Sequence, residues 1–219
     1  MRRALVFCAI TSVALGFGCG ASNPPVSDAG FGDTAGASEV PGVEHVRNVP
    51  ADCYREAISS GPGEDGHWIA ARLTPPSASF DLHGVRYEIY QGTRPRAAAC
   101  DASIAHRAAV FLGGDVPTAT PKFLRMFDIP TGSAPATDRR VIELRLPSPE
   151  TVNAPMKVYV AVQYGGSYPN TNCVVTCDSA GTTDRTWWSN AASPPFRWET
   201  LASFGFQRDL AALLIGVRR

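Results

Sequence analysis

The sequence lacks the short motifs by which many enzyme families are recognised. It contains no Gly-x-Ser-x-Gly nucleophile elbow, no His-Glu-x-x-His run, no Walker loop and no Rossmann glycine fingerprint. Its histidines show no pairing at i, i+2 or i, i+4, and they are His45, His67, His83 and His106. We therefore expect neither a metal site nor a cofactor, and catalysis is the less favoured hypothesis.

The chain also lacks an excess of either charge and lacks a long apolar run. Its 20 Lys and Arg residues balance 20 Asp and Glu residues, and no basic patch stands out. A nucleic-acid partner is therefore not expected. No segment reaches the roughly eighteen apolar residues that a membrane-spanning helix needs. Glycine (20) and proline (18) are frequent, which favours many short elements separated by turns.

The first eighteen residues have the pattern of a signal peptide. Arg2 and Arg3 supply positive charge, and the fourteen residues 4–17 are uncharged. A stretch of this length suits the apolar region of a signal peptide and is too short to span a bilayer. We therefore expect residues 1–18 to be a signal peptide.

The end of this segment, Gly16-Phe17-Gly18-Cys19, resembles the lipobox of bacterial lipoproteins, in which a small residue precedes the cysteine that is acylated. The leucine usual at the position of Gly16 is found one residue earlier, as Leu15. The resemblance implies that Cys19 carries palmitate and anchors the chain to the outer membrane of the cell envelope. Gly16 and Gly18 also suit the general signal peptidase, so a secreted or periplasmic protein is the alternative.

Residues 19–50 are predicted to be the lipidated cysteine followed by a flexible linker. Half of the thirty residues 21–50 are Gly, Pro, Ser or Ala, and Phe31 is their only aromatic residue. Such a segment buries too little apolar surface to offset the entropy of ordering it. The folded domain is therefore expected at residues 51–219.

Four cysteines follow this linker, an even number that indicates disulfides in an exported protein. The short spacing of Cys173 and Cys177 favours a local bridge, which leaves Cys53 to pair with Cys100. A four-cysteine zinc site is less favoured because such sites use paired short spacings. A redox-active pair would have two intervening residues instead of three.

Alternation of apolar and polar residues predicts strands at 85–90, 141–146 and 157–164. Weaker strand candidates are 68–73, 106–112, 123–127 and 196–201. The apolar segment 210–217 fits a helix or a buried central strand, and its short length with Gly216 near the end favours the strand. Turns rich in Gly and Pro separate these segments. The expected fold is all-β, a single β-sandwich domain, jelly-roll-like or otherwise, after a disordered N-terminal tether.

The order of several of these segments resembles a jelly-roll domain found in secreted and lipid-anchored bacterial proteins. The matching segments are 70–75, 85–90, 158–164, 198–201 and 209–218. The resemblance covers residues 67–219 and implies a jelly-roll sandwich. It implies no particular activity, because one fold serves many functions.

Aromatic and polar residues gather in segments 164–170 and 184–190, a combination typical of sugar-binding sites. Aromatic rings stack on the C–H faces of sugars, polar groups bind the hydroxyls, and jelly rolls often serve as lectins. The predicted ligand-binding residues are Tyr164, Tyr168, Asp184, Trp187, Trp188 and Asn190. Adjacent tryptophans on a strand point to opposite faces, so at least one of Trp187 and Trp188 should lie in the core.

The favoured function is a non-catalytic, envelope-anchored lipoprotein that acts as a surface binding or interaction module for a glycan or an envelope protein. A lectin-like, glycan-binding jelly roll is one alternative. A cryptic hydrolase is another, and it would need a pocket with two carboxylates or a Ser–His pair. Calcium at Asp178, Asp184 or Asp209 is a weaker hypothesis because it requires several converging oxygens.

Overall fold

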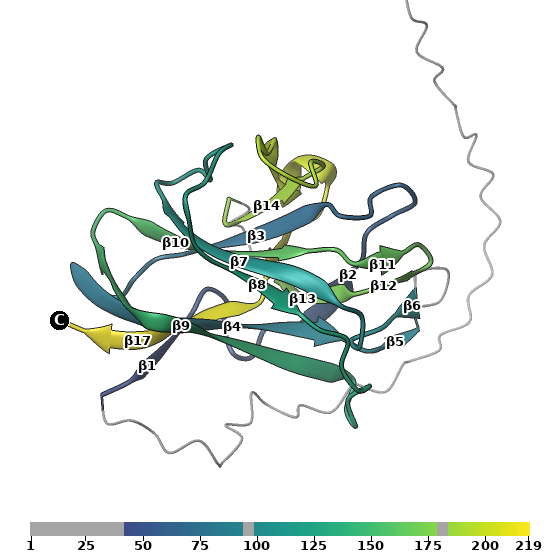
Figure 1. The fold of residues 1–219 in the computed structure, drawn as a ribbon, viewed down its shortest axis with the longest axis horizontal. Helices are drawn as coiled ribbons and strands as arrows, with labels where there is room; N and C mark the ends of the chain where they lie inside the picture. The colour runs from purple at the N-terminus through teal and green to yellow at the C-terminus, as the bar shows by residue number, and fades with distance from the viewer. Residues whose placement is uncertain (1–41, 94–98, 179–183) are drawn as a thin grey trace, which may run out of the picture. The chain divides into compact units, whose positions relative to one another are not determined.

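A computed structural model describes residues 42–93, 99–178 and 184–219. The expected signal peptide, Cys19 and residues 20–41 of the expected linker lie outside these ranges. The described residues form two large antiparallel sheets packed face to face, together with a small third sheet (Figure 1). The all-β sandwich predicted from the sequence is confirmed. Within the described ranges, no helix is long and apolar enough to span a bilayer.

The first sheet contains seven strands arranged around β4. They are β1 (Glu44–Arg47), β2 (Arg55–Ile58), β4 (Ser79–Tyr90), β9 (Arg139–Asn153), β13 (Cys173–Asp178), β16 (Arg208–Leu210) and β17 (Ala212–Arg218). β4 pairs with β9 along one edge and with β17 and then β13 along the other. β17 lies between β1 and β4, so the ambiguous segment 210–217 is mainly a buried central strand, as predicted.

The second sheet contains six strands, and the third contains four short ones. In spatial order the second has β15 (Trp198–Thr200), β14 (Thr186–Ser189), β3 (Trp68–Leu73), β10 (Lys157–Gln163), β7 (His106–Gly113) and β8 (Phe123–Ile129). The third has β11 (Gly166–Ser167), β12 (Asn170–Thr171), β6 (Ala99–Cys100) and β5 (Gly92–Thr93). A short 3-10 helix, η1 (Leu201–Phe204), follows β15.

The main core lies between the two large sheets, where the period-two pattern places alternate residues. Val160 and Val162 of β10 face inward with Tyr87 and Ile89 of β4, and all are fully buried. Burying one such side chain stabilises a fold by about 1.5–3 kcal/mol. The opposite face of β10 is also covered, because its Tyr159 packs in a second apolar cluster. β10 is therefore buried on both faces.

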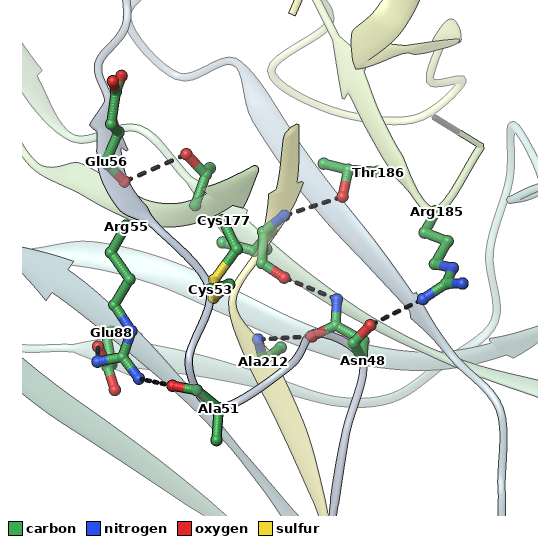
Figure 2. Close-up of a disulfide and its surroundings, with 12 residues drawn as sticks. Asn48, Ala51, Cys53, Arg55, Glu56, Glu88, Cys177, Arg185, Thr186 and Ala212 are labelled. Carbon is green, nitrogen blue, oxygen red and sulfur yellow. Dashed lines mark hydrogen bonds and ion pairs between the residues drawn. A yellow bond between two sulfur atoms is a disulfide. The ribbon is translucent and has the colours of Figure 1, made fainter. Parts of the chain in front are cut away.

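The folded domain begins before residue 51, which corrects the predicted boundary. β1 pairs with β17 from Glu44 opposite Gly216 onward. The amide nitrogen of the next residue, buried Asn48, donates to the Leu210 carbonyl at 2.7 Å, and its amide oxygen accepts from the Ala212 N–H at 3.0 Å (Figure 2). Asn48 thus bridges the break between β16 and β17. The low hydrophobicity of this segment suggested a linker. The segment belongs to the sheet because Asn48 bonds to backbone groups, and such bonds leave no apolar pattern in the sequence.

The disulfides join Cys53 to Cys177 and Cys100 to Cys173, so all four cysteines are paired but the predicted pairing is wrong. Cys173 and Cys177 lie on one extended strand, which places their Cα atoms about 13 Å apart at 3.3 Å per residue. A disulfide needs Cα atoms within about 7 Å, and the observed pairs are at 5.6 and 5.2 Å. A local bridge within β13 is therefore geometrically excluded.

Both disulfides lie on the outer face of β13. Cys173, Val175 and Cys177 pack away from the main core, while Val174 between them points into it. Cys177 bonds the segment before β2, and Cys173 bonds β6 of the small sheet; Figure 2 shows the first of these bonds. The two disulfides thus attach the segment before β2 and strand β6 to the outer face of β13.

Candidate functional site

A pocket of about 300 Å³ forms where four segments distant in sequence meet. The segments are the turn after β2, the β11–β12 connection, β14, and η1 with the residues that follow it. The lining residues are Ile58, Ser59, Ser60, Gly61, Glu64, Tyr168, Trp188, Leu201, Phe204 and Phe206. This volume is at the lower end of the range for small-ligand sites, which are mostly apolar with a few placed polar groups.

The apolar part of the pocket is mostly aromatic. Tyr168, Phe204 and Phe206 are 43%, 51% and 46% exposed, and three such rings at one hollow form a patch of the kind that marks binding sites. Trp188, by contrast, is buried among core residues. Its ring nitrogen donates to Nδ1 of His67 at 3.3 Å, and this hydrogen bond fixes the orientation of the indole ring.

The polar part of the pocket centres on Glu64, whose carboxylate is held by its own turn. The Gly61 N–H donates to Oε2 of Glu64 at 2.5 Å, and the Glu64 N–H donates to the Gly61 carbonyl at 3.2 Å. Among the described residues, Oε1 of Glu64 has no hydrogen-bond partner. Nearby, the buried hydroxyl of Ser60 lies 3.1 Å from that of Thr171. The turn therefore presents one free carboxylate oxygen in a fixed position.

Tyr168 is held in place by the small third sheet. Its hairpin, β11–β12, pairs with β6 through Thr171 beside Cys100, and the disulfide from Cys100 to Cys173 lies next to this pairing. The Ser167 hydroxyl donates to the Asp65 carboxylate at 3.1 Å, which connects the hairpin to the turn that carries Glu64. The aromatic and acidic parts of the pocket are thus connected through the residues next to Tyr168 and Glu64.

Three of the six predicted ligand-binding residues gather at this pocket. Tyr168 and Trp188 line it. Tyr164 lies behind Trp188, with ring centroids 4.9 Å apart, and its hydroxyl donates to the Ile58 carbonyl at 3.3 Å. Burial, with a smaller contribution from Glu64, raises the pKa of Tyr164 well above its usual value. Tyr164 is therefore a support for the pocket and does not line it.

The other three predicted residues lie away from the pocket. Trp187 points to the opposite face of β14 from Trp188, as predicted, and packs in the second apolar cluster, which also contains Tyr159. Asp184 is exposed and pairs with Arg72 at 3.3 Å. Asn190 is exposed and does not line the pocket. The two faces of β14 separate Trp187 from Trp188, whereas Asp184 and Asn190 lie outside this strand.

Sequence reasoning missed Glu64, Phe204 and Phe206. The turn 59–66 showed only the Gly and Pro content of an ordinary loop. The two phenylalanines follow β15 in a segment without periodic pattern, and they lie on and just after the short η1. Their meeting depends on contacts between distant segments, which local patterns do not encode. The one signal available in the sequence was the presence of two aromatic residues in a segment without periodic pattern.

A second, more open hollow contains His106, but this histidine is already occupied by structural contacts. The Tyr87 hydroxyl donates to Nε2 of His106 at 2.7 Å, and Nδ1 donates to the Ile104 carbonyl at 3.0 Å. Burial lowers the pKa of His106 and raises that of Tyr87, so both groups are neutral. Within the described ranges, no histidine is hydrogen-bonded to a serine, which is one of the two arrangements considered for a hydrolase.

The carboxylates considered for calcium have separate partners. Asp178 pairs with Arg208 at 3.5 Å, Asp184 with Arg72, and buried Asp209 accepts from the Thr186 hydroxyl at 3.0 Å. Across the described part of the chain, no three His, Cys, Asp or Glu side chains are grouped so as to hold a metal ion. The three aspartates do not converge on one point.

No family model matches the sequence, and no curated protein matches it significantly. Among solved structures, the cysteine protease and lectin-like domains of Cwp84, a surface-layer-associated protein of Clostridium difficile, match with a TM-score of 0.46 and 10% identity. The match covers 70% of this chain and 32% of that one, so this chain spans less than a third of the other. A similarity of this degree carries no inference about activity. The two disulfides are typical of an extracytoplasmic protein.

Proposed function

We propose that this protein is an extracytoplasmic, non-catalytic binding module that holds a sugar ring of a glycan in the pocket beside Glu64. The observation that carries the proposal is the meeting of three exposed aromatic rings with a fixed carboxylate in one hollow of about 300 Å³. The rings are those of Tyr168, Phe204 and Phe206. They offer flat faces for the C–H side of a sugar, and the carboxylate and serine hydroxyls offer partners for its hydroxyls.

The composition of the pocket favours binding over glycoside hydrolysis. Glycosidases generally place two carboxylates about 5–10 Å apart across the bond that is cleaved. Glu64 is the single carboxylate among the described residues that line the pocket. Its Oε2 is also engaged by the Gly61 N–H. A binding role uses the remaining oxygen as a hydrogen-bond acceptor and needs no second acid.

Truncating the aromatic rim should weaken glycan binding without unfolding the domain. We expect Tyr168→Ala and Phe206→Ala each to raise the Kd for a glycan selected on an array by about tenfold, because each removes a stacking partner. Isothermal titration calorimetry measures the change. Tyr54→Ala is a matched control, since Tyr54 is 67% exposed and does not line the pocket. An unchanged Kd in both rim variants would reject this site.

We also propose that Cys19 is the acylated N-terminal residue of the mature protein and that its lipid anchors the module to the outer membrane. The support is the lipobox-like sequence Gly16-Phe17-Gly18-Cys19. Several acyl chains together give durable membrane attachment, at about 0.8 kcal/mol per buried methylene. The membrane is then a partner through the lipid, and the pocket binds a separate component of the envelope.

Intact mass spectrometry of the protein from the membrane fraction tests the anchor. We expect a chain that begins at Cys19 with the added mass of acyl groups, and we expect Cys19→Ala to move the protein to the soluble fraction. Cys8→Ala is the matched control, because bulky Phe7 precedes that cysteine. An unmodified N-terminus at residue 19 or later would reject the lipid anchor and indicate a secreted or periplasmic protein.

A further inference from the structure

We infer that the glycan held in this pocket carries a free amino group, as in an amino sugar that is not acetylated, and that its ammonium group binds beside Glu64. The inference rests on the proposed glycan-binding function and specifies the chemistry of the ligand. It depends on the charge of the pocket, on the free oxygen of Glu64 and on the aromatic rings around it.

The charge of the lining residues selects against anionic ligands. Among the described residues that line the pocket, Glu64 is the only charged one, and neither Lys nor Arg is present. A carboxylate or sulfate on the ligand would be repelled by Glu64 and would find no opposing charge there. The ligand is therefore neutral or positively charged at this point.

The position of Glu64 favours the positive charge over the neutral one. Its carboxylate is held by the Gly61 N–H, so binding a ligand costs little additional ordering of the side chain. An ammonium group that donates to Oε1 forms a charge-assisted hydrogen bond, which is about twice as strong as one from a neutral hydroxyl. The partial burial of Glu64 reduces the screening of this interaction by water.

The aromatic lining adds to this preference. The faces of Tyr, Trp and Phe rings carry partial negative charge and attract ammonium groups within about 6 Å. Tyr168 comes from the β11–β12 connection and Trp188 from β14. Phe204 and Phe206 come from η1 and the residues after it. A sugar ring can therefore stack on one ring while its ammonium group lies near others and near Glu64. A neutral N-acetyl group would lose both contributions.

Two tetrasaccharides of β-1,4-linked glucosamine, one with free amines and one fully N-acetylated, test the inference with the purified protein. We expect the amine form to bind about tenfold more tightly in calorimetry at about pH 5.5, where the ligand's amines are protonated, given both favourable terms. Glu64→Gln should remove this difference, since its amide oxygen still accepts from the Gly61 N–H while the charge is lost. Glu150→Gln, which makes the same change at an exposed residue of β9 outside the pocket lining, should keep the difference.

The outcomes separate the two proposals. Equal binding of the two tetrasaccharides, or a preference that survives Glu64→Gln, overturns the amino-sugar inference and leaves glycan binding standing. If no glycan on the array binds, both proposals are overturned, whether or not a lysine-rich peptide or choline binds. A second measurement needs no variant: raising the pH until the ligand's amine is neutral should abolish the preference in the wild-type protein, and a preference that persists would also overturn the inference.

Discussion

Replacing Cys53 and Cys177 together by alanine is expected to lower the free energy of unfolding by about 5 kcal/mol, according to the loop-entropy relation for a bridge of this length. The two cysteines are 124 residues apart in sequence, so the bridge removes a large share of the conformations open to the unfolded chain. The loss is comparable to the whole stability of many domains, which is about 5–15 kcal/mol. Urea denaturation followed by tryptophan fluorescence measures it.

The second disulfide provides the comparison for this experiment. Cys100 and Cys173 are 73 residues apart, and their joint replacement should cost slightly less, about 4 kcal/mol. Because the second loop lies inside the first, the two losses should not add fully. Only the second replacement should also weaken ligand binding at Tyr168, since that bridge lies beside the β11–β12 hairpin. A loss below about 1 kcal/mol for the first pair would contradict the loop-entropy account.

Asp209→Asn is expected to stabilise the protein at neutral pH by about 2–3 kcal/mol, the free energy that corresponds to the shift of this carboxyl group. Asp209 is 1% exposed, and burial raises its pKa from 3.8 to about 6, although the Thr186 hydroxyl donates to it. Asparagine keeps an oxygen that can accept this hydrogen bond and carries no charge. The buried carboxylate therefore costs stability whenever it is ionised.

The sign of the pH dependence follows from the raised pKa. In the unfolded chain the carboxyl group of Asp209 loses its proton near pH 3.8, and in the folded protein it does so near pH 6. Stability from this group is therefore complete below about pH 4 and is lost as the pH rises through about 6. Urea midpoints of wild type and Asp209→Asn should coincide at pH 4 and differ at pH 7.5. Asp52→Asn, an exposed control, should change neither; equal midpoints at both pH values for Asp209→Asn would contradict the assignment.

The strands were predictable where one chemical pattern dominates. Alternation in segments 85–90 and 157–164 marks β4 and β10, because one face of each strand lies in the main core. The start of the domain was not predictable in this way. Asn48 and β1 belong to the sheet through backbone hydrogen bonds, which any sequence can make, and composition therefore assigned them to the linker.

The site was less predictable than the strands, for a related reason. Tyr168 and Trp188 were identified by residue type, and the structure places both at the pocket. Glu64 and Phe206 reach it from separate loops, so their proximity exists only in the folded protein. The disulfide pairing failed similarly, because proximity along the chain was taken for proximity in space, whereas β13 keeps Cys173 and Cys177 apart.

The connectivity of the disulfides has a consequence for how the protein must mature. In chain order the four cysteines of the folded domain are Cys53, Cys100, Cys173 and Cys177, and the native bonds join the first of these to the fourth and the second to the third. During N-terminus-first export, Cys53 and Cys100 enter the oxidising compartment together and ahead of both native partners. An oxidase acting in that order produces a non-native bond, which has to be opened again by thiolate attack. We therefore expect the yield of native protein to depend on a disulfide isomerase, and an expression host with an oxidase alone to accumulate misbridged chains.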